Sequence, residues 1–214
     1  MIRRIASDTD LEEGMAALSA AHPQWRALIA LTGLPPLRRR EAGFAELVAI
    51  IVGQQLSVES ARAILARMHA LLGPMTPERI RLATDDELRL TGLMRPKQRA
   101  IRALAEAIVI GGLDLDALEH ASPEEVHARL TAIHGIGPWT ADIYLLFSLG
   151  HGDGFAAGDL AIQEAARHAF SLPARPDAKA LAALAEAWRP WRGTAARLLW
   201  AYYALIKNRQ GINA

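Results

Sequence analysis

The sequence predicts an all-α protein, a helical bundle, and three observations carry this prediction. Alanine and leucine are frequent throughout, whereas the alternating β-branched runs that build strands are missing. Residues that cap helix N-termini recur along the chain, and proline often follows them. The chain has 214 residues, of which 51% are hydrophobic, so it can bury a sizeable core and is not disordered.

Proline and capping residues divide the first half of the chain into helices. Pro23 separates the first two, because proline removes a backbone donor. Ser57 is expected to cap the helix that follows it, and Thr76 and Thr84 to begin two short helices. The helices expected in this half span 9–21, 24–32, 44–52 and 58–72, followed by the two short ones from 76 and 84.

The second half is punctuated in the same way. Gly111 and Gly112 are expected to end a basic amphipathic helix. The run Ser122-Pro-Glu-Glu125 predicts a capping box that opens a helix leading into a glycine turn. Asp159 is expected to begin the helix after a glycine-rich loop. The helices expected here span 96–110, 122 to the turn, 138–149, 159–170, 178–188 and 191–207.

Composition excludes several classes of site. Without cysteine there is no disulfide, thiol nucleophile, cysteine-ligated zinc or iron–sulfur cluster. The seven histidines are scattered without metal-ligand spacing, so we expect no cofactor and no catalytic metal. No apolar run suits a signal peptide or a membrane span, which predicts a cytoplasmic protein, nucleoid-associated if prokaryotic. The net charge of +1 means that any contact with nucleic acid must come from a local patch.

The turn between residues 133 and 138 is the most informative segment. Gly135 and Gly137 permit the positive φ angles of a tight turn, and Pro138 suits the first position of the next helix. Such a turn exposes backbone N–H groups at the positive end of a helix, where a phosphate oxygen binds well. We therefore predict that Gly135, Gly137 and Thr140 contact DNA phosphate. The alternative is an ordinary turn between two helices, which also favours glycine.

Four segments, in order along the chain, resemble the helix–hairpin–helix superfamily of DNA glycosylases, and within it the compact form of 3-methyladenine DNA glycosylase II. The resemblance implies two lobes with the active cleft between them, a central lobe of 43–150 and a second lobe of 1–42 with 151–214. The segments are Gly53-Gln-Gln-Leu-Ser-Val58, Gly92-Leu-Met-Arg-Pro-Lys-Gln-Arg99, 133–141 with Asp159-Leu-Ala-Ile-Gln163, and Trp188-Arg-Pro-Trp-Arg-Gly-Thr-Ala195 with Trp200.

The resemblance makes Asp159 the catalytic carboxylate, a role compatible with capping a helix. Cleavage of an N-glycosidic bond builds positive charge on the sugar, which a carboxylate stabilises while it orients or deprotonates water. Relatives that also cut the backbone carry a lysine two residues after the second hairpin glycine. Trp139 occupies that position, so no Schiff base can form there. The enzyme is therefore expected to leave an abasic site without nicking it.

The resemblance also implies a base pocket, a wedge and a cation. Trp139 and Trp200 are expected to stack on the flipped base, with Ile143 and Leu160 where relatives can carry tyrosines. The wedge that fills the gap in the duplex is expected among Gln54, Gln55 and Leu56, and the last two are not separable. Lys97 is a candidate for packing or for a phosphate contact. Trp188 and Trp191 are expected to be structural, and Asp142 to have an ordinary surface or structural role. A possible monovalent cation is expected at the carbonyls of Thr131, Ile133 and Gly135.

The expected partner is double-stranded DNA with alkylated bases such as 3-methyladenine and 7-methylguanine, bound by a monomer. Two alternatives stay open. One is a related glycosylase for a different lesion, such as a mismatched or oxidised base. The other is a catalytically inactive helical module that recognises damaged DNA. Asp159 and the pocket tryptophans favour the enzyme.

Overall fold

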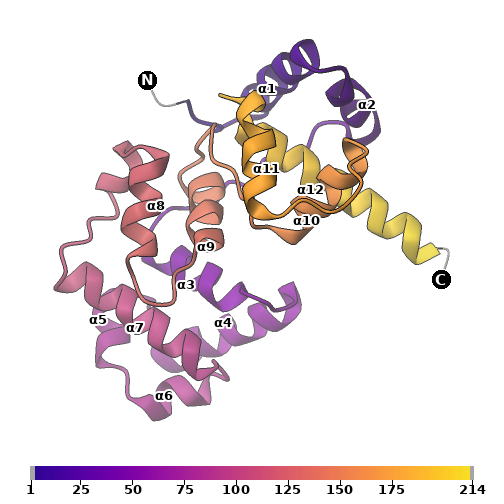
Figure 1. The fold of residues 1–214 in the computed structure, drawn as a ribbon. Helices are drawn as coiled ribbons and strands as arrows, with labels where there is room; N and C mark the ends of the chain where they lie inside the picture. Colours follow the sequence, from indigo (N-terminus) through magenta and orange to yellow (C-terminus); the bar gives the residue numbers. More distant parts are fainter. Residues whose placement is uncertain (1–2, 213–214) are drawn as a thin grey trace. The chain divides into compact units, whose positions relative to one another are not determined.

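The computed structural model describes residues 3–212 and is built of helices (Figure 1). Within this range there are twelve α-helices, two short 3-10 helices and one π-helical turn, and the one β-bridge joins Arg4 to His151. The prediction of an all-α protein is confirmed. No helix in the described range has both the length and the apolar character needed to cross a membrane.

The chain forms two compact units. The terminal unit comprises Met1–Arg39 together with Leu145–Ala214, and the middle unit comprises Arg40–Tyr144. The middle unit is one continuous stretch of chain, whereas the terminal unit joins the two ends of the sequence.

Helix α3 (Phe44–Gly53) is the core element of the middle unit. It is apolar on nearly all sides, and Leu47, Val48, Ile51 and Val52 are completely buried. It packs against α4, α7 and α9, while α5 packs on α7 and α8 on α9. The other elements of this unit are α4 (Val58–Leu72), α5 (Pro77–Leu82), α6 (Asp85–Leu90), α7 (Arg95–Val109), η1 (Ala117–His120), α8 (Pro123–Thr131) and α9 (Pro138–Ile143).

Helix α12 (Arg192–Ile212) organises the terminal unit and packs against α1, α2 and α10. Beside these contacts lies an aromatic cluster of Trp25, Phe155, Phe170 and Trp188, with ring centroids 5.1–5.6 Å apart. Trp188 is only 3% exposed, so its predicted structural role is confirmed. The remaining elements are α1 (Asp8–Ala21), α2 (Pro23–Thr32), α10 (Leu160–Ala169), α11 (Ala178–Ala185) and η3 (Glu186–Trp188).

The capping pattern read from the sequence is largely confirmed. Ser57, Thr76 and Thr84 each accept a backbone N–H from the first turn of α4, α5 and α6. Of the two hydrogen bonds in the capping box predicted at Ser122, only one forms. Ser122 does cap α8, but the Glu125 carboxylate pairs with Arg129 one turn later instead of returning to the cap.

The helix predicted over 138–149 is interrupted. Regular α-helix ends at Ile143, and a π-helical turn, η2 (Tyr144–Ser148), follows. Tyr144 is buried within the turn, and its hydroxyl accepts the Gly43 N–H at 3.0 Å. Burial raises the pKa of Tyr144 to about 12. Helix propensity is the same whether a backbone N–H bonds to the carbonyl four residues earlier, as in an α-helix, or five residues earlier, as in a π-helix. The sequence pattern therefore did not predict this turn.

Candidate active site

Asp159 caps α10, as the sequence predicts. Its backbone is extended, and the side-chain Oδ1 accepts the N–H groups of Ala161 at 2.9 Å and Ile162 at 3.1 Å. Because a helix N-terminus carries partial positive charge, it is a favourable place for a carboxylate. The start of α10 therefore positions this carboxylate locally.

A tertiary contact adds a third donor to the same oxygen. Trp200, on α12, donates its Nε1–H to Asp159 Oδ1 at 3.1 Å. The Trp200 ring packs against Phe147, with centroids 5.3 Å apart. Three N–H groups on one carboxylate oxygen fix the orientation of the carboxyl group. The sequence predicts Trp200 only as a pocket wall, because a separation of 41 residues gives no signal of this bond.

The two hairpin glycines differ in their structural reasons. Gly135 has φ 84°, and a Cβ there would lie 2.4 Å from the Cβ of Ala100 on α7, so both backbone and packing require glycine. Gly137 has φ −91° and ψ 172°, an ordinary extended conformation. The prediction of positive φ is thus right for Gly135 and wrong for Gly137. A Cβ on Gly137 would meet nothing within 4 Å, so nothing inside the protein requires glycine at this position.

The hairpin keeps backbone donors for a ligand. Its turn is closed by the Ile136 N–H, which donates to the Ile133 carbonyl at 3.1 Å. Among the described residues, no hydrogen bond uses the N–H of Gly135 or Gly137, and no side chain caps α9. An anion that approached Gly137 would find open space and unused donors.

Thr140 does not fit the predicted phosphate contact. Its residue is 1% exposed, its N–H donates to the Gly137 carbonyl, and its hydroxyl accepts the Gln54 Nε2–H at 2.7 Å. The hydroxyl accepts this bond and is almost completely covered, so burial of Thr140 argues against a direct phosphate contact. Its role is to hold the loop after α3 against the hairpin helix.

Lys97 braces the same loop. Its Nζ donates to the carbonyls of Val52 at 2.8 Å and Gln54 at 2.6 Å, and the residue is 7% exposed. Burial lowers the pKa of Lys97. Of the two roles predicted for this lysine, packing is confirmed, whereas the phosphate contact is disfavoured because the residue is buried and its ammonium group donates to two carbonyls. Lys97 thus satisfies carbonyls at the end of α3.

The three wedge candidates differ in how exposed their side chains are. The Gln54 side chain turns back to Thr140, so this residue is not placed as a wedge. Gln55 has φ 55°, a left-handed conformation that is unusual for glutamine, and its side chain is exposed. Leu56 is half-buried. The loop therefore presents Gln55 more openly than Leu56, a distinction that the sequence did not make.

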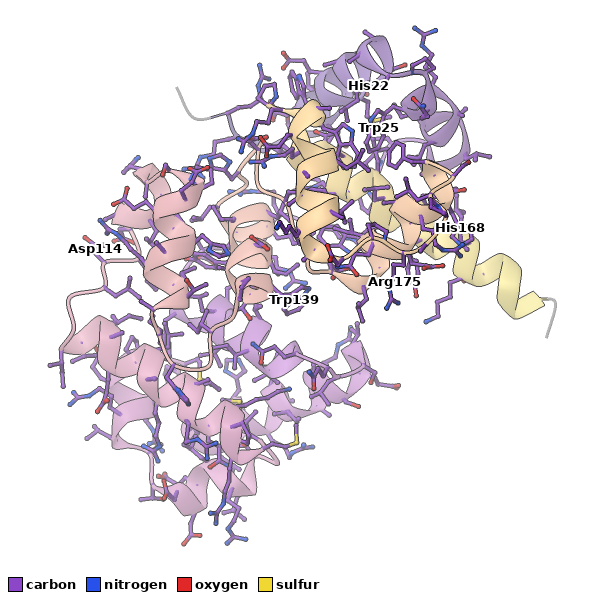
Figure 2. All side chains as sticks on the ribbon, viewed as in Figure 1. His22, Trp25, Asp114, Trp139, His168 and Arg175 are labelled. Atoms are coloured by element: carbon purple, nitrogen blue, oxygen red, sulfur yellow. The ribbon has the colours of Figure 1, made fainter. Side chains whose placement is uncertain are left out.

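The predicted base-pocket residues are divided between the two units. Trp139, which Figure 2 shows on α9, is half-buried, and Ile143 on the same helix is only 7% exposed. Leu160 and Trp200 belong to the terminal unit, and Leu160 is 62% exposed. Of the four, Trp200 bonds directly to Asp159. The cleft between the lobes stays a prediction.

Three further expectations concern charged groups and ions. Within residues 3–212, no group of three or more histidines, aspartates or glutamates gathers in a way that could hold a metal ion. Asp142 is largely buried beside His127, with 3.9 Å between Nε2 and Oδ1, which supports a structural role. The Ile133 carbonyl accepts an N–H within the turn, and a cation there stays a prediction.

Residues 48–190 match the HhH-GPD superfamily of base excision DNA repair proteins. This chain belongs to that superfamily. The matched residues include the hairpin, Asp159 and the loop after α3. The resemblance inferred from four sequence segments is therefore confirmed.

Named relatives in the HhH-GPD superfamily are similar over most of the chain. DNA-3-methyladenine glycosylase 1 of Schizosaccharomyces pombe is 33% identical over 199 residues, which cover 90% of this chain and 87% of the relative. A solved structure titled as the S. pombe 3-methyladenine DNA glycosylase in complex with abasic DNA superimposes with a TM-score of 0.79, at 33% identity, over 88% of this chain and 95% of that one.

Two bacterial proteins are also similar. The crystal structure of a DNA-3-methyladenine glycosidase from Bacillus halodurans has a TM-score of 0.79 at 31% identity and covers 97% of this chain and 94% of that one. DNA-3-methyladenine glycosylase 2 of Escherichia coli is 29% identical over 168 residues. Those residues are 73% of this chain but 56% of the E. coli protein, so the chain spans little more than half of that relative.

Proposed function

We propose that this chain is a monofunctional DNA glycosylase that excises alkylated bases, such as 3-methyladenine and 7-methylguanine, from duplex DNA as a monomer and without a cofactor. The observation that carries the proposal is the carboxylate of Asp159, held on one oxygen by α10 and by Trp200. This arrangement occurs in a chain whose family repairs DNA by base excision. The names of the relatives support the choice of alkylated bases.

The chemistry that the proposal assigns to Asp159 is electrostatic and general-base catalysis. As the bond between the base and C1′ breaks, the base leaves with the electron pair and the sugar becomes an oxocarbenium-like cation. A fixed carboxylate beside that cation lowers the energy of the transition state. Water then attacks C1′, and the carboxylate accepts its proton. A methylated purine already carries positive charge, so it leaves without strong acid assistance.

Trp139 determines how the reaction ends. An amine at this position would form a Schiff base with C1′ and lead to strand cleavage, whereas an indole has no nucleophilic nitrogen for that step. Water is then the nucleophile, and the product is an intact strand with an abasic site. The indole of Trp139 instead offers a face on which an electron-poor base stacks. Trp200, in the terminal unit, is proposed to offer a second such face.

Substrate range and DNA distortion follow from the neighbouring residues. Ile143 is almost completely buried and Leu160 is aliphatic, so the pocket is less aromatic than one built with tyrosines and is expected to accept several alkylated bases. Gln55 is the proposed wedge, since its exposed amide can fill the gap and bond to the orphaned partner base. The unused N–H groups of Gly135 and Gly137 would hold a backbone phosphate.

The test is release of free base from methylated duplex DNA by the wild-type protein and by Asp159→Asn. Asparagine still caps a helix, so the variant is expected to fold and to lose release by about 10²–10⁴-fold, the usual range for general acid–base catalysis. Asp177→Asn is the matched control, because Asp177 caps α11 in the same unit through one bond to Ala180 N–H. Strands should break only after alkali treatment.

The alternatives give different results in the same assay. A glycosylase for another lesion would release a deaminated, oxidised or etheno base but no methylated purine. A damage-binding module would bind abasic DNA and release no base of any kind. Release that persists in Asp159→Asn would remove Asp159 from the mechanism.

A further inference from the structure

Beside Trp200 on the terminal unit there is a small niche. Its volume is about 10 Å³, room for about one water-sized group. A nucleobase is several times too large for it, whereas a single oxygen of an oxyanion fits. The lining residues are Pro36, Arg38, Phe147, Arg197, Trp200 and Ala201.

The niche has a positive charge at its base, and no carboxylate among the described residues forms an ion pair with it. Arg197 is 3% exposed and lies over the Phe147 ring. Its guanidinium donates to the carbonyls of Leu146 at 2.7 Å, Gly193 at 2.9 Å and Leu37 at 3.4 Å. Buried arginines are normally paired with an anion. The charged neighbours of Arg197 are instead Arg38 and Arg39, and burial together with these two cations lowers the pKa of Arg197 to about 10.

Arg38 forms the exposed edge of the niche. Its φ is 51°, a left-handed conformation that is unusual for arginine, and its side chain is exposed. No hydrogen bond or ion pair in the described part of the chain uses its guanidinium, whereas one nitrogen of Arg39 donates to the Ser148 carbonyl. Strained backbone at an exposed residue whose charged group has no hydrogen bond or ion pair within the described residues motivates a functional hypothesis.

We propose that Arg38, with the buried charge of Arg197 behind it, binds a phosphodiester group of the DNA strand that carries the damaged base. The proposal rests on the proposed function, because it takes DNA as the ligand. Trp200 links the niche to the reaction centre, since it lines the niche and bonds to Asp159. The phosphate groups of a nucleotide flank its sugar, and Asp159 is proposed to face that sugar, so a cation that lies beside Trp200 is suited to contact one of these phosphates. This contact is separate from the hairpin, which lies in the middle unit.

Charge and size both favour a phosphate over the damaged base. A guanidinium pairs with two phosphate oxygens and gains from the second cation. A methylated purine is itself cationic, so two arginines would repel it. Contact with the base remains the alternative that the experiment must separate.

The experiment measures affinity for a duplex that contains a tetrahydrofuran abasic analogue, at several salt concentrations. Arg38→Gln keeps an unbranched side chain on the left-handed backbone but removes the charge, and it is expected to lower the slope of log affinity against log salt by about one. Arg38→Lys should retain the slope, because lysine keeps the charge. The control is Arg26→Gln on α2, an exposed arginine of the same unit that bonds to the Ser19 carbonyl.

A methylphosphonate beside the abasic analogue locates the contact. This neutral group should weaken wild-type binding and have no further effect on Arg38→Gln. Equal slopes for Arg38→Gln, Arg26→Gln and wild type would overturn the proposal. So would an unchanged slope with an altered ratio of 7-methylguanine to hypoxanthine release, because Arg38 would then face the base. If wild-type protein binds with the Arg38-dependent slope but releases no base, the proposed function fails and this inference stands.

Discussion

The starts of α10 and α9 are both helix N-termini, and the protein uses them in opposite ways. At α10, Oδ1 of Asp159 accepts two backbone N–H groups and the indole N–H of Trp200. At α9, Gly137 supplies no side-chain cap, and among the described residues no bond uses its N–H. A group that performs chemistry needs internal bonds that fix it, whereas a surface that binds an anion keeps its donors unused.

Gly135→Ala disrupts the hairpin before α9 and has the largest expected effect of the substitutions. The added Cβ would lie 2.4 Å from the Ala100 Cβ. Overpacking and positive φ together predict a loss of about 3 kcal/mol in the free energy of unfolding, measured by denaturant titration. Gly112→Ala is the control, since Gly112 also has positive φ, 74°, but nothing within 4 Å. Equal losses in both variants would show that packing on α7 is unimportant.

Trp200→Phe tests the internal bonds at α10. Phenylalanine keeps an aromatic face but cannot donate to Asp159 Oδ1, and a hydrogen bond to a charged group is worth about 1.5–3 kcal/mol. The rate constant for base release at saturating DNA should fall by about 10–100-fold. Affinity for abasic DNA should change much less. Trp191→Phe is the matched control, because the indole of Trp191 lies under the Arg3 guanidinium. A normal rate constant in Trp200→Phe would mean that Trp200 acts only through stacking.

Gly137→Ala sharpens the contrast between the two hairpin glycines. With extended backbone and open space around it, alanine should leave the free energy of unfolding within about 0.5 kcal/mol of wild type. The methyl group would keep a phosphate away from the N–H groups, so DNA affinity should fall by about tenfold, equivalent to 1.4 kcal/mol. Unchanged affinity would place the phosphate contact elsewhere.

Lys97→Met has the smallest expected effect and tests whether the wedge loop also depends on internal bonds. Methionine keeps the packing but leaves the carbonyls of Val52 and Gln54 without their donor. A loosened loop should slow base flipping, seen as 2-aminopurine fluorescence, and lower release by about fivefold for a loss of about 1 kcal/mol. DNA affinity at the hairpin should not change. Lys179→Met on the exposed surface of α11 is the control, and an equal loss there would remove the specific role of Lys97.

Local pattern was enough to predict most helix boundaries and most caps. Ser57, Thr76, Thr84 and Asp159 cap helices as expected, because an N-cap depends on bonds within one turn. The wrong predictions have both local and distant causes: Glu125 pairs with Arg129 one turn later, whereas Thr140 has a partner far away in sequence. Thr140 is 1% exposed and bonds to Gln54, 86 residues before it, which argues against its predicted phosphate contact.

The sequence by itself determined the class of fold, the family and the position of the carboxylate. Helical periodicity, caps and the glycine hairpin are local features, and Trp139 in place of lysine is a matter of residue identity. Only the tertiary structure decided that Trp200 holds Asp159, that Lys97 and Thr140 brace the loop before Gln55, and that Arg38 and Arg197 share a niche. Those relations join residues between 41 and 159 positions apart. Tertiary packing creates these contacts, and a local sequence pattern contains no information about which distant residues will pack together.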